Sequence, residues 1–285
     1  MEFGVQIFGC LSECRKNPDA FFKSLAEAGY KQIEPCILFD DPRIMSENAR
    51  MDENEFMERL AENLWKPDEL PQYIRTMEKY GLELSSVHVF ANNIDQVVDQ
   101  MIETAKKNNI STYVVNCNQQ TIATEYEQFA KECSNLAGML KEHGIELWIH
   151  NNGAEIKAMV EHNGKQMPVL SAILNLCKKA NVGAQIDVGW VLFGGIDPVK
   201  YLNEMKEYVK SVHFKDLRKD FENRQDGDIF ICLGDGALNV KEILECVPLN
   251  SGISVIVDQD ASDGDIMEDI IKSCKVLHDA GMSDR

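Results

Sequence analysis

Eight short apolar runs alternate along this chain with helical segments, and this alternation constrains the fold more than any other feature. The runs begin at Phe3 (FGVQIF), Gln32 (QIEPCI), Leu84 (LSSVHVF), Thr112 (TYVVNC), Glu146 (ELWIH), Gly183 (GAQID), Lys210 (KSVHF) and Ile253 (ISVIVD). Between the third and fourth runs, apolar residues follow the i, i+3, i+4, i+7 spacing of an amphipathic helix: Ile94, Val97, Val98, Met101, Ile102 and Ala105. The sequence therefore predicts eight strands separated by helices.

The composition of the predicted strands indicates a buried parallel sheet. Runs rich in Val and Ile without strict alternation are typical of strands that are covered on both faces. Eight of them in alternation with helices predict a single (β/α)8 TIM barrel, one α/β domain over residues 1–285, and an apolar fraction of 44% is enough to build its core. An open doubly wound sheet is the alternative. No G-x-G-x-x-G follows the first run, so a dinucleotide site of that type has no support.

Three segments are longer than the simple repeat requires. They follow the second, fifth and seventh predicted strands, at residues 38–67, 151–169 and 216–239. The second segment is expected to form a hairpin or an irregular loop, and the first carries apolar residues at helical spacing: Phe56, Met57, Leu60, Leu64 and Trp65. Long loops in a compact domain are usually functional or disordered. Since all three follow strands that bear polar residues, we expect them to be lids over a site.

Charge and cysteine content exclude several classes of partner. The formal net charge of −18 disfavours nucleic acids and acidic membrane surfaces, because binding to polyanions depends on Lys and Arg. No run approaches the roughly 20 apolar residues of a membrane span, and the N-terminus lacks the basic region of a secretory signal. Nine cysteines without a C-x-x-C pair fit a reducing cytoplasm and support neither a zinc ribbon nor a redox motif. We expect a cytoplasmic protein, for which a homo-oligomer is compatible with the sequence.

Four polar residues each follow an apolar run directly. His150 follows ELWI, Asp187 follows AQI, His213 follows KSV and Asp258 follows SVIV. In a parallel barrel the carboxyl ends of the strands meet at one rim, where active sites lie. Two imidazoles and two carboxylates that converge there would suit a divalent cation. A solvated or helix-capping side chain is the usual alternative for each residue alone, and their recurrence favours the metal site.

Other polar residues near the strand ends are candidates for contacts with a substrate. Lys215 lies two residues after His213 on the same strand face, with a surface ion pair as its alternative. Glu34 ends the second run and would either bind substrate or pair with a basic side chain. His88 fits a buried core histidine slightly better than a substrate contact, and Trp190 would either form a floor under a sugar ring or fill the barrel rim.

The motifs around these residues resemble the sugar phosphate isomerase/epimerase family, whose fold is the xylose isomerase-like TIM barrel. The resemblance covers nearly the whole chain. It rests on IEP at Glu34, IHNNGAEI around His150, IDVGW at Asp187, VHFKDL at His213, LGDGALN at Gly234 and IVDQDAS at Asp258. The last four motifs are the more specific, because they occur together, in order and at appropriate spacing.

The resemblance implies a divalent metal, commonly manganese, that is bound at the ends of strands five to eight and chelated by a sugar or cyclitol. Asp187 and His213 carry over as ligands, and Asp258 carries over as a shorter carboxylate in place of glutamate. His150 stands where the family has a glutamate that is both ligand and base, so it is predicted as a ligand or as an acid/base group. Zn, Co and Mg also fit, although two nitrogen donors disfavour Mg.

The predicted function is a metal-dependent isomerase or epimerase that acts on a small polyhydroxylated sugar or cyclitol carbonyl compound through an enediolate. The predicted catalytic residues are His150, Asp258, Lys215 and Glu34. The predicted substrate contacts are His88, Trp190, Asn152, Glu155 and Asp260, and Glu155 could also supply the missing carboxylate. Two alternatives stay open: a dehydratase or lyase for a keto-sugar or inosose with the same metal site, and a non-catalytic sugar-binding or partner subunit.

Overall fold

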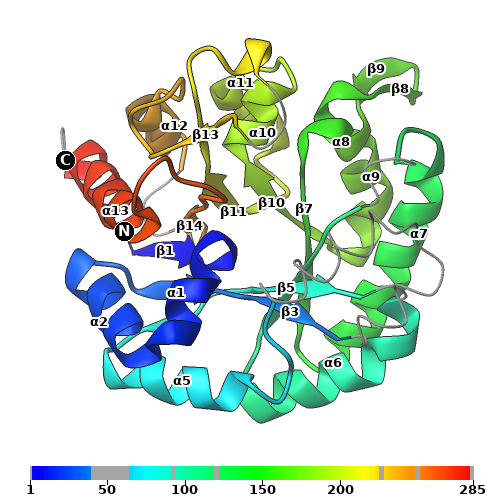
Figure 1. The fold of residues 1–285 in the computed structure, drawn as a ribbon. Coiled ribbons are helices and arrows are strands. Elements are labelled where there is room, and N and C mark those ends of the chain that lie inside the picture. The colour runs from blue at the N-terminus through cyan, green and yellow to red at the C-terminus, as the bar shows by residue number, and fades with distance from the viewer. Residues whose placement is uncertain are drawn as a thin grey trace, which may run out of the picture.

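The computed structural model describes residues 2–39, 64–91, 94–117, 122–224, 228–247 and 251–282 (Figure 1). Within these residues the main sheet has ten strands, all paired in parallel. They are β1 (Phe3–Gln6), β2 (Gln32–Glu34), β3 (Cys36–Leu38), β4 (Glu83–Leu84), β5 (Val87–Phe90), β6 (Thr112–Val115), β7 (Glu146–His150), β10 (Gly183–Asp187), β11 (Val209–Phe214) and β14 (Ser254–Val257). Their order is β3-β5-β6-β7-β10-β11-β14-β1-β2-β4. Each of the eight predicted strands is confirmed.

The sheet closes into a barrel at the second and third predicted strands, each of which is split in two. Pro35, which has no N–H to give to a neighbour, separates β2 from β3, and two serines separate β4 from β5. β2 pairs with β1 and β4, whereas β3 pairs with β5. The backbone N–H of His88 donates to the carbonyl of Pro35 at 3.0 Å and continues the ladder across the break. If the two halves of each split strand are counted together, the ten described strands form a closed parallel barrel of eight strands.

Helices follow the strands and surround the barrel (Figure 1). They are α1 (Leu11–Lys16), α2 (Pro18–Ala28), α5 (Leu70–Lys79), α6 (Ile94–Asn108), α7 (Ile122–Lys141), α8 (Gly153–Lys157), α9 (Val169–Cys177), α10 (Val188–Phe193), α11 (Pro198–Met205), α12 (Val240–Glu245) and α13 (Ile266–Met282), with 3-10 turns at Phe8–Cys10, Lys178–Ala180 and Phe221–Asn223. Val97, Val98 and Met101 of α6 are buried, which confirms the predicted amphipathic helix. Among the described helices, none combines the length and the apolar content that crossing a bilayer requires.

The three long segments differ in how far the prediction can be followed. Residues 40–63 of the first segment lie outside the described residues. At the end of that segment, Trp65 forms an isolated β-bridge with Ile37, so the helix suggested by the apolar spacing does not include Trp65. The second contains α8 and an antiparallel hairpin of β8 (Met159–His162) and β9 (Lys165–Pro168), which is one of the two expected forms. The third contains the antiparallel pair β12 (Asp216–Leu217) and β13 (Phe230–Ile231). The role of these segments as lids stays a prediction.

Asp216 organises the third segment. Its carboxylate accepts the backbone N–H groups of Leu217, Gly234, Gly236 and Leu238 at 2.9 to 3.1 Å. A side chain at position 236 would bring a Cβ within 2.2 Å of Oδ1 of Asp216, so only glycine allows the loop to wrap this closely. The loop is thereby tied to the end of β11, next to the rim of the barrel.

Side chains alternate between the outside and the inside of the barrel along each strand. On β10, Ala184 and Ile186 belong to the apolar core, whereas Gln185 and Asp187 share the opposite face. Residues two apart on a barrel strand lie in successive layers of the interior. Gln185 therefore belongs to a layer that is deeper than that of Asp187, and the same reasoning places Ser211 below His213 on β11.

Candidate metal centre

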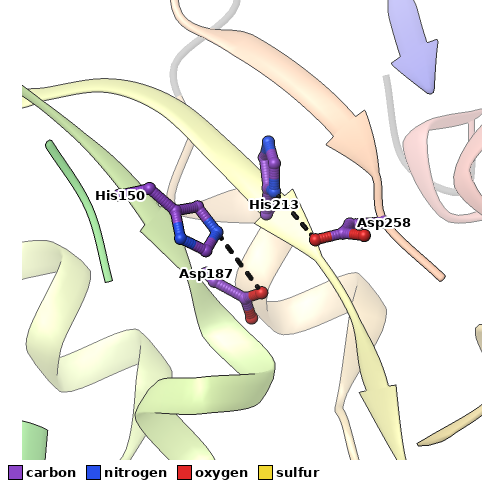
Figure 2. Close-up of side chains that lie close together, drawn as sticks. All are labelled: His150, Asp187, His213 and Asp258. Carbon is purple, nitrogen blue, oxygen red and sulfur yellow. Dashed lines mark hydrogen bonds and ion pairs between the residues drawn. The ribbon is translucent and has the colours of Figure 1, made fainter. Parts of the chain in front are cut away.

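Four side chains from four neighbouring strands converge at the carboxyl end of the barrel (Figure 2). His150 ends β7, Asp187 ends β10, His213 lies on β11, and Asp258 directly follows β14. Nε2 of His150 lies 3.7 Å from Oδ2 of Asp187, and Nδ1 of His213 lies 3.1 Å from Oδ2 of Asp258. One ligand atom from each residue can be chosen so that all four lie within 4.8 Å of one another. The structure thus brings together the four residues predicted as ligands.

The donor atoms of this group are buried and largely without partners. None of the four residues is more than 4% exposed. Among the described residues, no hydrogen-bond partner meets either ring nitrogen of His150, Oδ2 of Asp187 or Oδ1 of Asp258. Each buried polar atom left unpaired costs about 1–3 kcal/mol, which coordination to a cation would offset. Two imidazoles and two carboxylates suit Mn, Co or Zn, so the residues fit the predicted divalent ion.

The two histidines lie in opposite electrostatic environments. Burial, followed by the nearby charge of His213, holds the pKa of His150 well below its usual value. Burial also acts to lower the pKa of His213, but the carboxylates of Glu34 and Asp258 outweigh it and raise that pKa to about 10. His150 therefore offers a free lone pair at neutral pH, whereas His213 must release a proton before Nδ1 can bind a cation.

The two carboxylates also differ. Burial raises the pKa of Asp187 to about 6, although the charge of Lys215 acts against it. Burial acts in the same direction on Asp258, but there Lys215 and His213 outweigh it, and the pKa lies below the ordinary range. Asp258 is therefore ionised throughout the neutral range, and Asp187 takes up a proton in mildly acidic solution.

Lys215 lies beside the group, on the strand face it shares with His213. Its Nζ is 2.9 Å from Oδ2 of Asp258, 2.8 Å from Oδ2 of Asp260 and 3.8 Å from Oδ2 of Asp187. Burial acts to lower the pKa of Lys215, but these carboxylates hold it well above its usual value, so the side chain is an ammonium. At 4% exposure this is a buried ion pair, and the alternative of a surface ion pair is wrong.

Trp190 connects the group to an aromatic cluster at the rim. Oδ1 of Asp187 accepts the backbone N–H of Trp190 at 3.0 Å, so the same carboxylate also caps α10. The indole ring packs edge-on against Phe193 and Phe230, at centroid distances of 5.3 and 5.6 Å, and lies 5.7 Å from Nζ of Lys215. The packing matches the expectation that Trp190 fills the rim, and its contact with a sugar stays a prediction.

Glu34 does not have the position that the sequence suggested. It is fully buried in the layer of Gln185, where Oε2 accepts hydrogen bonds from Ser86 Oγ and from Gln185 Nε2 at 2.7 Å. Its Oε1 lies 2.7 Å from Nε2 of His213 and 2.9 Å from Nε2 of His88. The prediction that Glu34 orients substrate is corrected: its carboxylate is enclosed by side chains beneath the group, and its charged partners are histidines rather than Lys or Arg.

Three other predicted substrate contacts have structural roles. His88 is buried and its Nε2 lies at 2.7 Å from Oε1 of Gln185, as expected for a core histidine. Asn152 and Glu155 form the capping box of α8, in which Glu155 Oε1 accepts the Asn152 backbone N–H at 3.3 Å. Cys117 Sγ donates to the same oxygen at 2.7 Å. Glu155 is thus engaged elsewhere and does not belong to the four-residue group.

Sequence reasoning missed the residues that support the group from below and from the side. Asn151 holds the backbone of Asp187 through both of its amide atoms, at 3.0 and 3.2 Å. Gln185 Nε2 reaches Ser211 Oγ at 3.3 Å as well as Glu34. A usable signal was present, because Gln185 and Ser211 each stand two residues before a predicted ligand and therefore share its strand face.

Comparison with known proteins adds the following findings. An inosose dehydratase from Lacticaseibacillus casei is 24% identical over 174 residues, which are 56% of this chain and 55% of the dehydratase, so the match spans about half of that relative. Among solved structures, a sugar phosphate isomerase/epimerase from Parabacteroides distasonis ATCC 8503 has a TM-score of 0.67 at 17% identity, with 97% of each chain covered. An IolI protein with a bound zinc atom has a TM-score of 0.63 at 14% identity, with 98% of each chain covered. At these identities the solved structures support the fold alone.

The sequence profile of one family matches residues 22–277, which is most of the chain. That profile describes the xylose isomerase-like TIM barrel, in agreement with the closed parallel barrel found here. The chain therefore belongs to the xylose isomerase-like TIM barrel family.

Proposed function

We propose that the protein is a metal-dependent isomerase or epimerase of a small polyhydroxylated carbonyl compound, a sugar or a cyclitol. One observation carries the proposal: His150, Asp187, His213 and Asp258 converge at the carboxyl end of the barrel, and several of their buried donor atoms have no hydrogen-bond partner among the described residues. This is where barrel enzymes of this architecture have their active sites. A sugar phosphate isomerase/epimerase shares this fold, and its reaction class is carried to this chain only as part of the proposal.

Asp187, His213 and Asp258 would hold the cation. When bound, a divalent ion supplies Lewis-acid polarisation of carbonyl and hydroxyl oxygens. Manganese is the proposed ion, and zinc and cobalt suit the same mixture of nitrogen and oxygen donors. An IolI protein of the same fold binds a zinc atom, and the proposal extends a divalent ion of this kind to this chain.

The chain's own residues supply the groups that proton transfer needs. The ring of His150 is neutral, and neither of its nitrogens has a hydrogen-bond partner in the part of the chain that the structure describes, so it can accept a proton from the carbon next to a carbonyl. The ammonium of Lys215, fixed by Asp258 and Asp260, can stabilise the negative charge that then develops on the substrate oxygen. The ring of Trp190 lies beside that ammonium and can pack against the C–H face of a sugar.

Deuterium exchange tests the proposal across a panel of candidate substrates. Protein loaded with Mn²⁺ or Zn²⁺ would be incubated in D2O with neutral ketoses, aldoses and inososes. We expect deuterium at the carbon next to the carbonyl of one compound, followed by an isomer or epimer of unchanged composition. Chelation of the metal and the substitution Asp187→Ala should both abolish exchange, whereas Glu83→Gln, at the exposed start of β4, should not. Full turnover by rigorously metal-free protein would overturn the proposal.

A dehydratase is the second candidate, and the match to an inosose dehydratase favours it. The first step would be the same transfer of a carbon-bound proton to His150. In the second step the bond from the next carbon to its hydroxyl breaks, and the proton returns from His150 to the leaving hydroxyl, which departs as water. Mass spectrometry separates the two reactions, because an isomer keeps the mass of the substrate and a dehydration product lacks one water.

A further inference from the structure

Glu34 is held firmly by one of its carboxylate oxygens. Oε2 accepts a hydrogen bond from Ser86 Oγ, in the break between β4 and β5, and another from Gln185 Nε2 on β10 at 2.7 Å. Gln185 is itself fixed, because its Oε1 lies 2.7 Å from Nε2 of His88. These contacts come from the β4–β5 segment and from β10. They leave the other oxygen of Glu34, Oε1, turned towards the two imidazoles.

His213 lies between two carboxylates that approach opposite ring nitrogens. Oδ2 of Asp258 is 3.1 Å from Nδ1, and Oε1 of Glu34 is 2.7 Å from Nε2, which is an ion-pair contact rather than an aligned hydrogen bond. A neutral imidazole carries its proton on one nitrogen and a lone pair on the other. Asp258 belongs to the group of donor atoms, whereas Glu34 lies one layer deeper. If the group holds a cation, the lone pair of His213 would lie on Nδ1, facing the group, and its proton on Nε2, facing Glu34.

We propose that Glu34 is a positioning residue of the metal centre, and that its carboxylate keeps His213 protonated at Nε2 so that Nδ1 can bind the cation. The inference rests on the proposed metal site and extends it to a residue that is enclosed beneath the ligands. A carboxylate behind a metal-binding histidine fixes the orientation of the ring and makes it a better donor, and loss of such a partner weakens metal binding about 10- to 100-fold.

A second cation between Glu34, His88 and His213 is the competing explanation. One donor atom from each of these residues can be chosen so that all three lie within 4.8 Å of one another. Positioning is favoured because Nε2 of His88 already has a partner in Gln185, and because Oε1 of Glu34 and Nε2 of His213 are in direct contact at 2.7 Å. The number of ions bound per chain separates the two explanations.

Glu34→Gln is the direct test, because it keeps the shape of the side chain and removes its charge. Zinc affinity is measured by competition with a chelator at neutral pH, zinc content by atomic absorption, and the protonated nitrogen of His213 by long-range ¹H–¹⁵N NMR of the zinc-loaded chain. We expect one zinc per chain in both proteins, an affinity about 10- to 100-fold lower in the variant, and loss of the single Nε2–H form of His213. Unchanged affinity, or two ions in the wild type and one in the variant, would overturn the inference.

Two further variants keep the test decisive. Glu83→Gln makes the same substitution at an exposed position of β4 and should leave zinc affinity unchanged. Ser86→Ala removes one hydrogen bond to Glu34 but leaves its carboxylate, so zinc affinity should fall measurably but by less than about 10-fold. This variant tests the inference even if Glu34→Gln does not fold. Ser86→Ala with wild-type zinc affinity and a wild-type NMR spectrum would count against positioning. A wild-type chain that binds no zinc, manganese or cobalt would instead overturn the metal centre itself.

Discussion

Two polar layers lie one above the other inside the same barrel, and they differ in how their hydrogen bonds are met. In the deeper layer, Gln185 donates to Glu34 and Ser211 and is close to His88, and the one oxygen of Glu34 without a hydrogen bond from any described residue, Oε1, lies 2.7 Å from His213 and 2.9 Å from His88. In the layer above, both ring nitrogens of His150, Oδ2 of Asp187 and Oδ1 of Asp258 have no hydrogen-bond partner within the described ranges. Both layers are buried, so burial alone does not mark a functional site. Native proteins pair nearly all their buried polar groups, and the layer that departs further from this rule is the one poised to bind a ligand.

His150→Gln should have the largest effect on the upper layer. Removal of a general base typically lowers the rate by about 10²- to 10⁴-fold, and we expect that loss in the deuterium-exchange assay. Zinc content, measured by atomic absorption, should stay at the wild-type level, since three other ligands remain. Loss of the ion together with activity would show instead that His150 is a ligand and that the proton is taken by another group.

Asp187→Asn should weaken metal binding by more than about 100-fold, because a ligand matters more than the outer partners whose loss costs up to that factor. The asparagine oxygen can still accept the backbone N–H of Trp190, so the cap of α10 should survive. Chelator competition and urea unfolding of the metal-free chain are the two measurements. If the variant binds zinc as tightly as the wild type, the upper layer is no metal centre.

Gln185→Leu should lower the stability of the fold, in addition to the loss of zinc affinity expected when a hydrogen bond to Glu34 is removed. It removes a donor to Glu34 and an acceptor near His88 in the deeper layer. A buried polar group left without its partner costs about 1–3 kcal/mol, so the free energy of unfolding in urea should fall by that amount. A neutral effect on stability would contradict the view that this layer is a structural network.

Metal binding should release about one proton per ion near neutral pH. Burial acts to lower the pKa of His213, but Glu34 and Asp258 raise it to about 10, so the ring carries an extra proton below that pH. A cation at Nδ1 displaces this proton, and zinc affinity should therefore rise with pH up to about pH 10 and fall as the solution is acidified. Calorimetry in buffers of different ionisation enthalpy counts the protons. Zinc affinity that does not change with pH would show that the cation displaces no proton from His213.

The wall of the barrel could be predicted from sequence because local composition decides it. Runs rich in Val and Ile identify the strands, and a polar residue at the end of each of four runs identified the upper layer, since every parallel strand ends at the same rim. Pro35 also carried a usable signal, because a proline inside a strand interrupts its ladder. The split of the third strand between Leu84 and Val87 has no comparable signal in the sequence.

The position of Glu34 could not be predicted in the same way. Its depth depends on which side chains face it across the barrel, and its partner Gln185 is 151 residues away in the sequence. A carboxylate at the end of a run looks the same whether it reaches a substrate or supports a ligand from below. The capping box of Asn152 and Glu155 shows the converse, because this local hydrogen-bond pattern was readable from the sequence, whereas contact of the two residues with a substrate stays a prediction.

The backbone of Trp65 completes the wall next to the split strand. Its N–H donates to the carbonyl of Cys36 and its carbonyl accepts from the N–H of Leu38, both at 2.9 Å, while its buried ring stacks on Tyr73. Splitting the second strand would otherwise leave β3 with bare backbone groups on one side, and such an edge invites pairing with an extended segment of another chain. One residue from beyond a long connection therefore protects this barrel from edge-to-edge aggregation.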